Sequence, residues 1–338
     1  MSAIDPLSAA PATGAPMPMT QSPLENISAT IKESVLEALT PLALRKSLLE
    51  DIMRTRGFAP NGKLRKLLEP IVAAPMDRFI NICYEFDQRA EQFGFMQAAR
   101  WMLPHFAGGV EVIGAEQIPL EGPLLLVSNH PGSFDEVAIA ANLDRADLRI
   151  LANRHTLLTS LPSVARTAIF SSEHDAHDRM SALRTSIKTL REGRTLLLFP
   201  TGRTDPDPRC TAGASEAIAR WSSSIEMLVN KAPETQVIIT IVSGVISPMA
   251  LRSPVAWVRR QPIEQQKMAT MLQFALQLIF PRMFNLVPRV TFSAPQTMAE
   301  LTAGGAQSVQ QSIVEQAQRL LALHTVRDHI VQPTFLRA

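Results

Sequence analysis

The stretch Leu124-Leu125-Leu126-Val127-Ser128-Asn129-His130-Pro131-Gly132-Ser133-Phe134-Asp135 holds an apolar run, a turn and the start of a further element. A continuous apolar run, unlike an alternating one, is typical of a strand that is covered on both faces. Pro131-Gly132 indicates a turn, and Ser133 or Asp135 is suited to begin a helix. The stretch therefore predicts a buried strand that leads through a polar turn into a helix.

The alternation of strand and helix continues along the rest of the chain. Apolar runs predict strands at 110–114, 123–129, 148–153, 167–172, 195–200, 235–244 and 289–293. Helical periodicity predicts helices at 134–143, 178–192, 213–230, 262–280 and 305–323. Alternating strands and helices indicate an α/β fold. We expect a mixed, largely parallel sheet flanked by helices.

The first third of the chain differs in composition from the remainder. Residues 1–24 hold five prolines and almost no charge, which predicts a disordered leader because too little apolar surface can be buried. Residues 25–106 show apolar side chains at helical spacing, which predicts a helical N-terminal unit. Residues 107–330 then form the predicted α/β domain.

Composition argues against several classes of protein. Lys and Arg number 33 against 31 Asp and Glu, a net charge of +2, with no long basic run that would indicate nucleic-acid binding. Cys83 and Cys210 stand far apart without nearby ligands at metal-finger spacing, which makes a disulfide framework or a structural zinc site unexpected. No stretch is apolar and long enough for a membrane span. We expect a cytoplasmic protein.

His130 and Asp135 follow the buried strand and form the first candidate pair for chemistry. A carboxylate that folds back onto one imidazole nitrogen fixes the tautomer and supports the charge that forms when the other nitrogen takes a proton. Such a pair can activate a hydroxyl group. The alternative is an Asp that only caps the helix beside a solvent-exposed loop His.

A second strand exit runs Leu196-Leu197-Leu198-Phe199-Pro200-Thr201-Gly202-Arg203-Thr204-Asp205-Pro206-Asp207-Pro208. Gly202 lets the backbone approach a ligand closely, and the Arg203 guanidinium is suited to bind a phosphate group. The alternative is a solvated loop in which Arg203 pairs with Asp205 or Asp207.

Residues 172–179, Ser-Glu-His-Asp-Ala-His-Asp-Arg, gather two histidines among charged side chains. Imidazole and carboxylate groups coordinate first-row metal ions, but no familiar ligand spacing is complete. Asp175 and Asp178 are also explained as the cap and a first-turn acid of the helix that follows.

The two exits in this order, Asn129-His130 with Asp135 and then Phe199-Pro200-x-Gly202-Arg203, resemble the glycerolipid acyltransferase family. This family includes glycerol-3-phosphate and lysophosphatidate acyltransferases. The resemblance covers roughly residues 105–250, and its pattern is most similar to the soluble plastid-type glycerol-3-phosphate acyltransferases.

Three positions depart from the family pattern. Membrane-bound members carry Glu where this chain has Thr201. The soluble plastid-type branch has a second Arg at the position of Asp205 and a basic residue at the position of Glu173. With two cations missing, we expect a doubly charged glycerol phosphate to be held less well.

The resemblance implies a reaction and a set of roles. His130 would act as general base on the acceptor hydroxyl, oriented by Asp135, and the hydroxyl would attack the thioester of acyl-CoA or acyl carrier protein. The implied acceptor is glycerol 3-phosphate or a lysophospholipid. No metal or further cofactor is implied, because the thioester supplies the leaving group. The implied substrate-binding residues are Arg203, Gly202, His174 and Thr201, with Arg154 and Arg166 as weaker candidates.

Two further features remain open at this stage. The helix from Met268 to Phe280 is rich in Met and Phe and would line an acyl groove or contact a membrane surface, or it is an ordinary buried face. Two other functions compete with acyl transfer. One is a metal-dependent hydrolase using His130, Asp135, His174, Asp175 and His177, and the other is a catalytically degenerate protein that binds lipid or an acyl carrier.

Overall fold

The computed structural model describes residues 63–132, 134–172, 175–281, 283–303, 308–326 and 334–335, and the side chains within 75–334 of these. The predicted leader and the part of the helical unit before residue 63 lie outside these residues, as do Glu173 and His174. None of the described helices is both long and apolar enough to cross a membrane.

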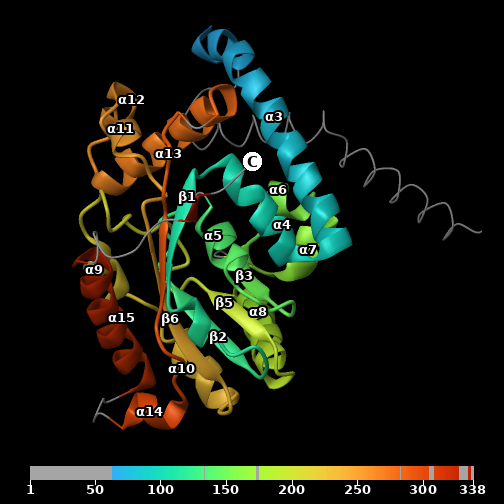
Figure 1. Cartoon of the computed structure of the whole chain (residues 1–338), viewed down its shortest axis with the longest axis vertical. Coiled ribbons are helices and arrows are strands. Elements are labelled where there is room, and N and C mark those ends of the chain that lie inside the picture. Colours follow the sequence, from blue (N-terminus) through green and yellow to red (C-terminus); the bar gives the residue numbers. More distant parts are fainter. Residues whose placement is uncertain are drawn as a thin grey trace, which may run out of the picture.

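One mixed sheet organises the described chain (Figure 1). Its strand order is β4-β3-β5-β2-β6-β7-β1-β8. From β4 to β6 all neighbours are parallel, whereas β7 pairs antiparallel with β6 and β8 pairs antiparallel with β1. The mixed, largely parallel α/β fold is therefore confirmed. The strands are β1 (Gly109–Ile113), β2 (Leu124–Ser128), β3 (Arg149–Asn153), β4 (Ala168–Ser171), β5 (Thr195–Leu198), β6 (Gln236–Ser243), β7 (Arg289–Phe292) and β8 (Thr334–Phe335).

Alternating side chains of β2 enter two separate hydrophobic cores. Leu124 and Leu126 pack on one face of the sheet with α3 (Lys63–Phe93), α4 (Phe95–Met102), α5 (Asp135–Ala141) and α13 (Pro262–Ile279). Leu125 and Val127 pack on the other face with α8 (Ala176–Arg191), α10 (Ser224–Lys231) and α15 (Val309–Val326). A strand covered on both faces needs apolar residues at every position, which explains the unbroken run.

The described N-terminal helices share the first of these cores. Phe86 of α3 and Ala99 of α4 belong to the same buried cluster as Leu126. On α3, the ring of Phe79 meets that of Phe274 of α13 edge-on at 6.0 Å. The helical unit is thus one wall of the α/β core.

The observed helices differ from the predicted ones in two respects. The predicted helix 213–230 is two helices, α9 (Ala214–Ile218) and α10, because Trp221 turns into the core and the Ser222 hydroxyl accepts the Ser224 N–H at the start of α10. Short helices were also missed, three of them beginning at proline, which lacks the N–H that a first turn leaves unused. They are α6 (Thr156–Thr159), α7 (Pro162–Thr167), α11 (Pro248–Leu251), α12 (Pro254–Trp257) and α14 (Met298–Thr302), with 3₁₀ turns at Leu103–His105 and Ala115–Gln117.

A buried arginine, Arg145, forms hydrogen bonds to loops at the amino ends of the strands. Arg145 donates to the carbonyls of Pro119, Gly122 and Gly193 at 2.9, 2.6 and 3.3 Å, and to both carboxylate oxygens of Asp147 at 2.9 and 2.7 Å. Its side chain is 2% exposed.

Replacing this arginine tests the fold. Arg145→Ala leaves several buried acceptors without a donor and should lower the free energy of unfolding by about 3 kcal/mol. Urea unfolding at neutral pH measures the change, with the exposed Arg184→Ala on α8 as a control expected within about 0.5 kcal/mol of the parent. Equal effects of the two substitutions would contradict this account of Arg145.

Candidate active site

The turn after β2 brings His130 and Asp135 together. Gly132 has φ +102°, a left-handed conformation that glycine adopts without strain. Asp135 is the first residue of α5, and its carboxylate oxygens accept the N–H groups of Gly132 at 3.0 Å and Glu136 at 2.8 Å. These bonds fix the carboxylate within the turn.

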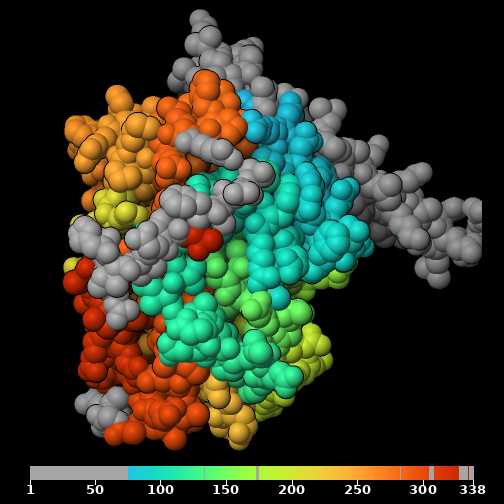
Figure 2. Space-filling model, viewed as in Figure 1, coloured from blue at the N-terminus to red at the C-terminus, as the bar shows by residue number. Residues whose placement is uncertain are grey.

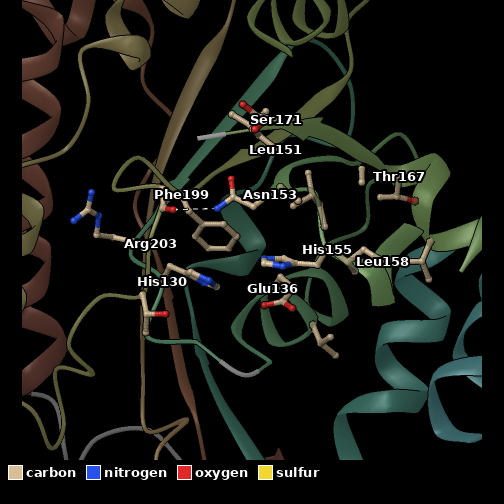
Figure 3. Close-up of a pocket in the computed structure, with 18 of the residues that line it drawn as sticks. His130, Glu136, Leu151, Asn153, His155, Leu158, Thr167, Ser171, Phe199 and Arg203 are labelled. Atoms are coloured by element: carbon tan, nitrogen blue, oxygen red, sulfur yellow. Dashed lines mark hydrogen bonds between the residues drawn. The ribbon is translucent and has the colours of Figure 1, made fainter. Parts of the chain in front are cut away.

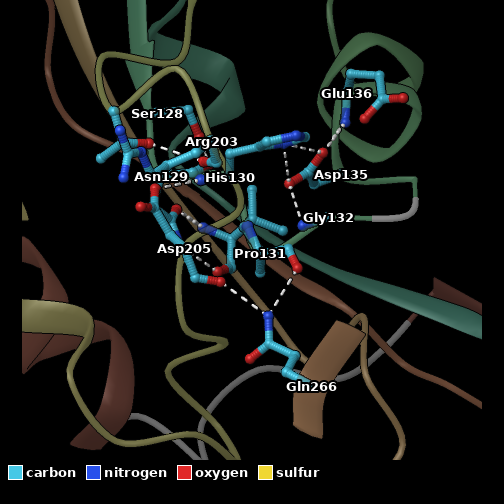
Figure 4. Close-up of polar contacts among 12 residues, drawn as sticks. Ser128, Asn129, His130, Pro131, Gly132, Asp135, Glu136, Arg203, Asp205 and Gln266 are labelled. Carbon is cyan, nitrogen blue, oxygen red and sulfur yellow. Dashed lines mark hydrogen bonds and ion pairs between the residues drawn. The ribbon is translucent and has the colours of Figure 1, made fainter. Parts of the chain in front are cut away.

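The His130 imidazole lies directly against this carboxylate (Figure 4). Its Nδ1 is 3.1 Å from Oδ1 and 3.0 Å from Oδ2 of Asp135. The Asp135 side chain is fully buried, whereas that of His130 is 29% exposed. The ring also packs against Phe199, centroid to centroid at 4.5 Å. The predicted pairing of imidazole and acid is therefore present, and Nε2 is the nitrogen that Asp135 leaves available.

The pair has strongly shifted pKa values. Burial alone would lower the pKa of His130, but the charge and hydrogen bond of Asp135, with the charges of Glu136 and Asp205, raise that pKa to about 9. Burial opposes ionisation of Asp135 too, yet the His130 charge and the hydrogen bonds to the carboxylate lower its pKa to about 2. The two groups form an ion pair at neutral pH.

Asp205 holds the backbone of His130 in place (Figure 4). The His130 N–H donates to Asp205 Oδ2 at 2.9 Å, and the Asp205 N–H donates to the His130 carbonyl at 2.7 Å. Gln266 of α13 then donates to the carbonyls of Asp205 and Pro131 at 2.8 and 3.0 Å. The alternative in which Arg203 pairs with Asp205 does not hold, because the buried carboxylate of Asp205 accepts the His130 N–H.

Asn129 anchors the same turn to β6. Its side-chain amide donates to the Val242 carbonyl at 2.9 Å and accepts the Val242 N–H at 2.8 Å. Hydrogen bonds therefore join the turn after β2 to β6 through Asn129 and to the loop after β5 through Asp205.

A cavity of about 460 Å³ opens beside His130 (Figure 3). Part of its lining is apolar and comes from helices and β3, and the polar part comes from the ends of β3 and β4, from α8 and from the loop after β5. The apolar residues include Phe86, Phe95, Val137, Ile150, Leu158 and Val164, and the polar ones include Asn153, Ser171, Arg179, Gly202, Arg203 and Thr204.

The predicted substrate-binding residues divide into two groups. Arg203 and Gly202 line the cavity. Thr201 does not line it, and its hydroxyl donates to the Arg203 carbonyl at 2.9 Å. Arg154 and Arg166 also lie off the cavity lining, where Arg154 stacks over Phe170 and Arg166 donates to the Ser163 hydroxyl. His174 lies outside the described residues.

Several polar cavity residues were missed from the sequence, and four of them carry ionisable or amide side chains. Glu136 follows Asp135 directly, and its pKa is raised well above the ordinary value by burial and by the neighbouring Asp135. Arg179, Asn153 and His155 reach the cavity from α8, the end of β3 and the loop after it. A lone Asn or His after a strand carries no pattern, which explains why sequence reasoning did not single these out.

The histidine-rich segment has a structural explanation. Asp175 is the N-cap of α8 and accepts the N–H groups of His177 and Asp178 at 2.8 and 3.4 Å. Neither Asp175 nor His177 lines the cavity. Within the described part of the chain, the one group with metal-ligand atoms close together is His130, Asp135 and Glu136, so the set proposed for a hydrolase is not assembled there.

The prediction that the Met268–Phe280 helix lines an acyl groove is not supported by the described residues. No α13 residue belongs to the cavity lining. The apolar wall comes instead from side chains of α3, α4, α5, α6, α7 and β3.

Part of the chain matches the model of a known protein family. Residues 109–247 match the family model described as Acyltransferase. This region includes both motif loops, and the match confirms the resemblance predicted from them. No curated protein is significantly similar in sequence to the chain. Among solved structures, the chain is similar to the 1-acyl-sn-glycerophosphate acyltransferase PlsC of Thermotoga maritima, with 14% sequence identity and a TM-score of 0.41. The similarity covers 90% of this chain and 98% of that chain. A similarity this distant does not define a function.

The His130–Asp135 ion pair predicts a pH-dependent stability. The raised pKa of His130 stabilises the fold fully below 6.5, and this stabilisation is lost as the pH rises through about 9. The lowered pKa of Asp135 stabilises the fold above 3.8, and this is lost as the pH falls through about 2. The difference in free energy of unfolding between the parent and Asp135→Asn should therefore be largest between pH 3.8 and 6.5.

Urea unfolding of both proteins across the pH range checks this expectation. Asp175→Asn, at an exposed helix cap, is the matched control and should show no such maximum. A difference between parent and Asp135→Asn that stays constant up to pH 10 would contradict the assigned pair.

Proposed function

We propose, from the match of residues 109–247 to the family model described as Acyltransferase, that the protein moves a fatty acyl group from a thioester carrier to the hydroxyl of a glycerol-phosphate acceptor. The acceptor is glycerol 3-phosphate or a lysophospholipid, and the donor is acyl-CoA or acyl carrier protein. The observation that carries the proposal is a single cavity whose lining combines His130, Arg203 and an apolar wall.

In the proposed reaction His130 is the general base. Its Nδ1 faces Asp135, so Nε2 takes the proton from the acceptor hydroxyl as the hydroxyl oxygen attacks the thioester carbonyl. The C–O bond forms, the C–S bond breaks, and the imidazolium returns its proton to the departing thiolate. Asp135 keeps the ring oriented and supports its positive charge. The thioester supplies the leaving group, so this reaction needs no metal.

The two parts of the cavity suit the two substrates. The rings of Phe86 and Phe95, with Leu158 and Val164, form an apolar wall for the acyl chain. Arg203 and Arg179 supply guanidinium groups for a phosphate at the polar part. The expectation of a cytoplasmic protein that contacts a membrane stays a prediction.

Removal of the base gives the main test. His130→Ala should lower the turnover number by about 10²- to 10⁴-fold, because the acceptor hydroxyl loses its general base. Free thiol released from palmitoyl-CoA, with and without glycerol 3-phosphate or a lysophospholipid, measures the reaction. The exposed His177→Ala on α8 is the matched control and should keep parental turnover. Undiminished acyl transfer by His130→Ala would overturn the assigned base, and thermal stabilisation by palmitoyl-CoA without thiol release would indicate a binding protein.

Removal of the cavity cation separates acceptor binding from chemistry. Arg203→Ala should raise the KM for the phosphorylated acceptor by about 10- to 100-fold, since a charge-assisted contact is lost. The turnover number and the KM for palmitoyl-CoA should change little. Arg166→Ala, whose guanidinium lies off the cavity lining, is the control. If Arg166→Ala had the larger effect on the acceptor KM, the phosphate would lie elsewhere.

A further inference from the structure

Large apolar side chains are exposed at one end of the molecule. Among the described residues, seven of the thirteen exposed large apolar side chains fall between positions 249 and 283. Trp257 is 70% and Val258 is 75% exposed, and a cluster of exposed apolar side chains commonly marks an interaction site. The other five are Met249, Val255, Ile279, Phe280 and Met283; we call these seven residues the apolar end.

The helices that carry the apolar end lie at the carboxyl edge of the sheet. Helix α11 follows the end of β6, and α11 and α12 pack against α13. Figure 1 shows these three helices grouped at the upper end of the molecule, and in Figure 2 the orange segment forms the upper part of the visible face. The His130 turn follows β2 at the same edge of the sheet.

Helix α13 buries glutamines beside Met268 and Ala269 and leaves several apolar side chains toward the outside. Its most buried side chains include three glutamines, which hydrogen-bond to loops: Gln266 to Asp205 and Pro131, Gln273 to Ser247 and Val245, and Gln277 to Phe106. Its Met271, Leu272, Ala275, Leu276 and Ile279 are only partly buried or exposed. A helix against water normally shows the opposite distribution, so this outer face suits apolar surroundings.

The segment before α13 that carries Trp257 and Val258 has charges of one sign. Residues 248–261 contain Arg252, Arg259 and Arg260 and no acidic residue, and all three arginines are exposed. Exposed Trp and aliphatic side chains bordered by arginine are typical of surfaces that enter the headgroup region of an anionic bilayer. A second copy of the chain is a poor occupant, because a two-fold contact would place these arginines against their own copies.

We propose that the apolar end docks on the surface of a bilayer that contains anionic lipids. Trp257 and Val258 enter the boundary between headgroups and acyl chains, and Arg259 and Arg260 bind the lipid phosphates. Helix α3 connects this surface to the cavity, since its Phe79 contacts Phe274 of α13 and its Phe86, about 10 Å further along the helix, lines the cavity. Docking holds the protein at the membrane that contains its lipid substrates, a step that rests on the proposed function.

Flotation with lipid vesicles tests the docking surface. The full chain should float with phosphatidylcholine vesicles that contain phosphatidylglycerol, and less well with phosphatidylcholine alone. Trp257→Ser/Val258→Ser and, separately, Arg259→Glu/Arg260→Glu should each weaken binding by about tenfold or more. Leu120→Ser, equally exposed on a loop away from this end, and Arg184→Glu on α8 are the matched controls and should bind like the parent. Parental binding by both double variants would overturn the proposal.

Further measurements exclude other occupants. Phe280→Ser/Met283→Ser should reproduce the loss if either first variant fails to fold. A parent that elutes as a dimer and a Trp257→Ser/Val258→Ser variant that elutes as a monomer would assign the surface to a second copy instead. Without vesicles, iodide should quench Trp257 fluorescence, identified by comparison with Trp257→Phe; an unquenched Trp257 would show that other residues of the chain already cover it, against the proposal.

Membrane docking and acyl transfer can be tested independently of each other. His130→Ala should float like the parent even if it has no turnover. The apolar-end variants should keep parental thiol release with short-chain, water-soluble substrates and lose it only with substrates embedded in vesicles. Absence of thiol release in every assay, with flotation intact, would refute acyl transfer alone.

Discussion

The ion pair between Asp135 and His130 is the interaction on which the rest of the site depends. A fully buried carboxylate is costly unless its oxygens are bonded, and here each oxygen accepts a backbone N–H of the turn as well as facing the imidazole. The carboxylate therefore does two things at once. It closes the turn between β2 and α5, and it fixes which imidazole nitrogen faces the cavity. The acid that begins α5 and the acid that faces the imidazole, which the sequence leaves as alternatives, are the same group.

The aspartates in the loop after β5 also stabilise the structure through hydrogen bonds to backbone N–H groups. Asp205 bonds to the His130 backbone, and Asp207 accepts the N–H groups of Arg209, Gly244 and Ile246 at 2.9, 3.0 and 3.1 Å. This accounts for an acidic residue at a position where the soluble plastid-type pattern has arginine: the carboxylate points into the scaffold, and the nearby cations that reach the cavity are Arg203 and Arg179. The loop after β5 thus tightens the imidazole turn with its acids and presents a cation to the cavity.

Sequence reasoning succeeded where one residue type at one spacing has one physical explanation. Continuous apolar runs predicted all seven long strands, because β2 and its neighbours are covered on both faces. The His130–Asp135 pair was predictable for the same reason, since the turn between them is local. What could not be predicted depends on distant segments. Glu136 and Asn153 reach the cavity only after the sheet and α5 are assembled, and the buried glutamines of α13 reverse the expected burial of a helix whose apolar periodicity had indicated the opposite face.

The raised pKa of His130 bears on how such a base would operate. At neutral pH the resting imidazole is charged, and a charged imidazole cannot take a proton. An acyl chain that fills the apolar part of the cavity would expel water from the exposed face of the ring, and desolvation favours the neutral form. A phosphate bound at Arg203 would act in the other direction, because a nearby negative charge favours the imidazolium. The guanidinium groups of Arg203 and Arg179 offset that negative charge. The cations of the cavity therefore contribute to keeping the base available, as well as to holding the acceptor.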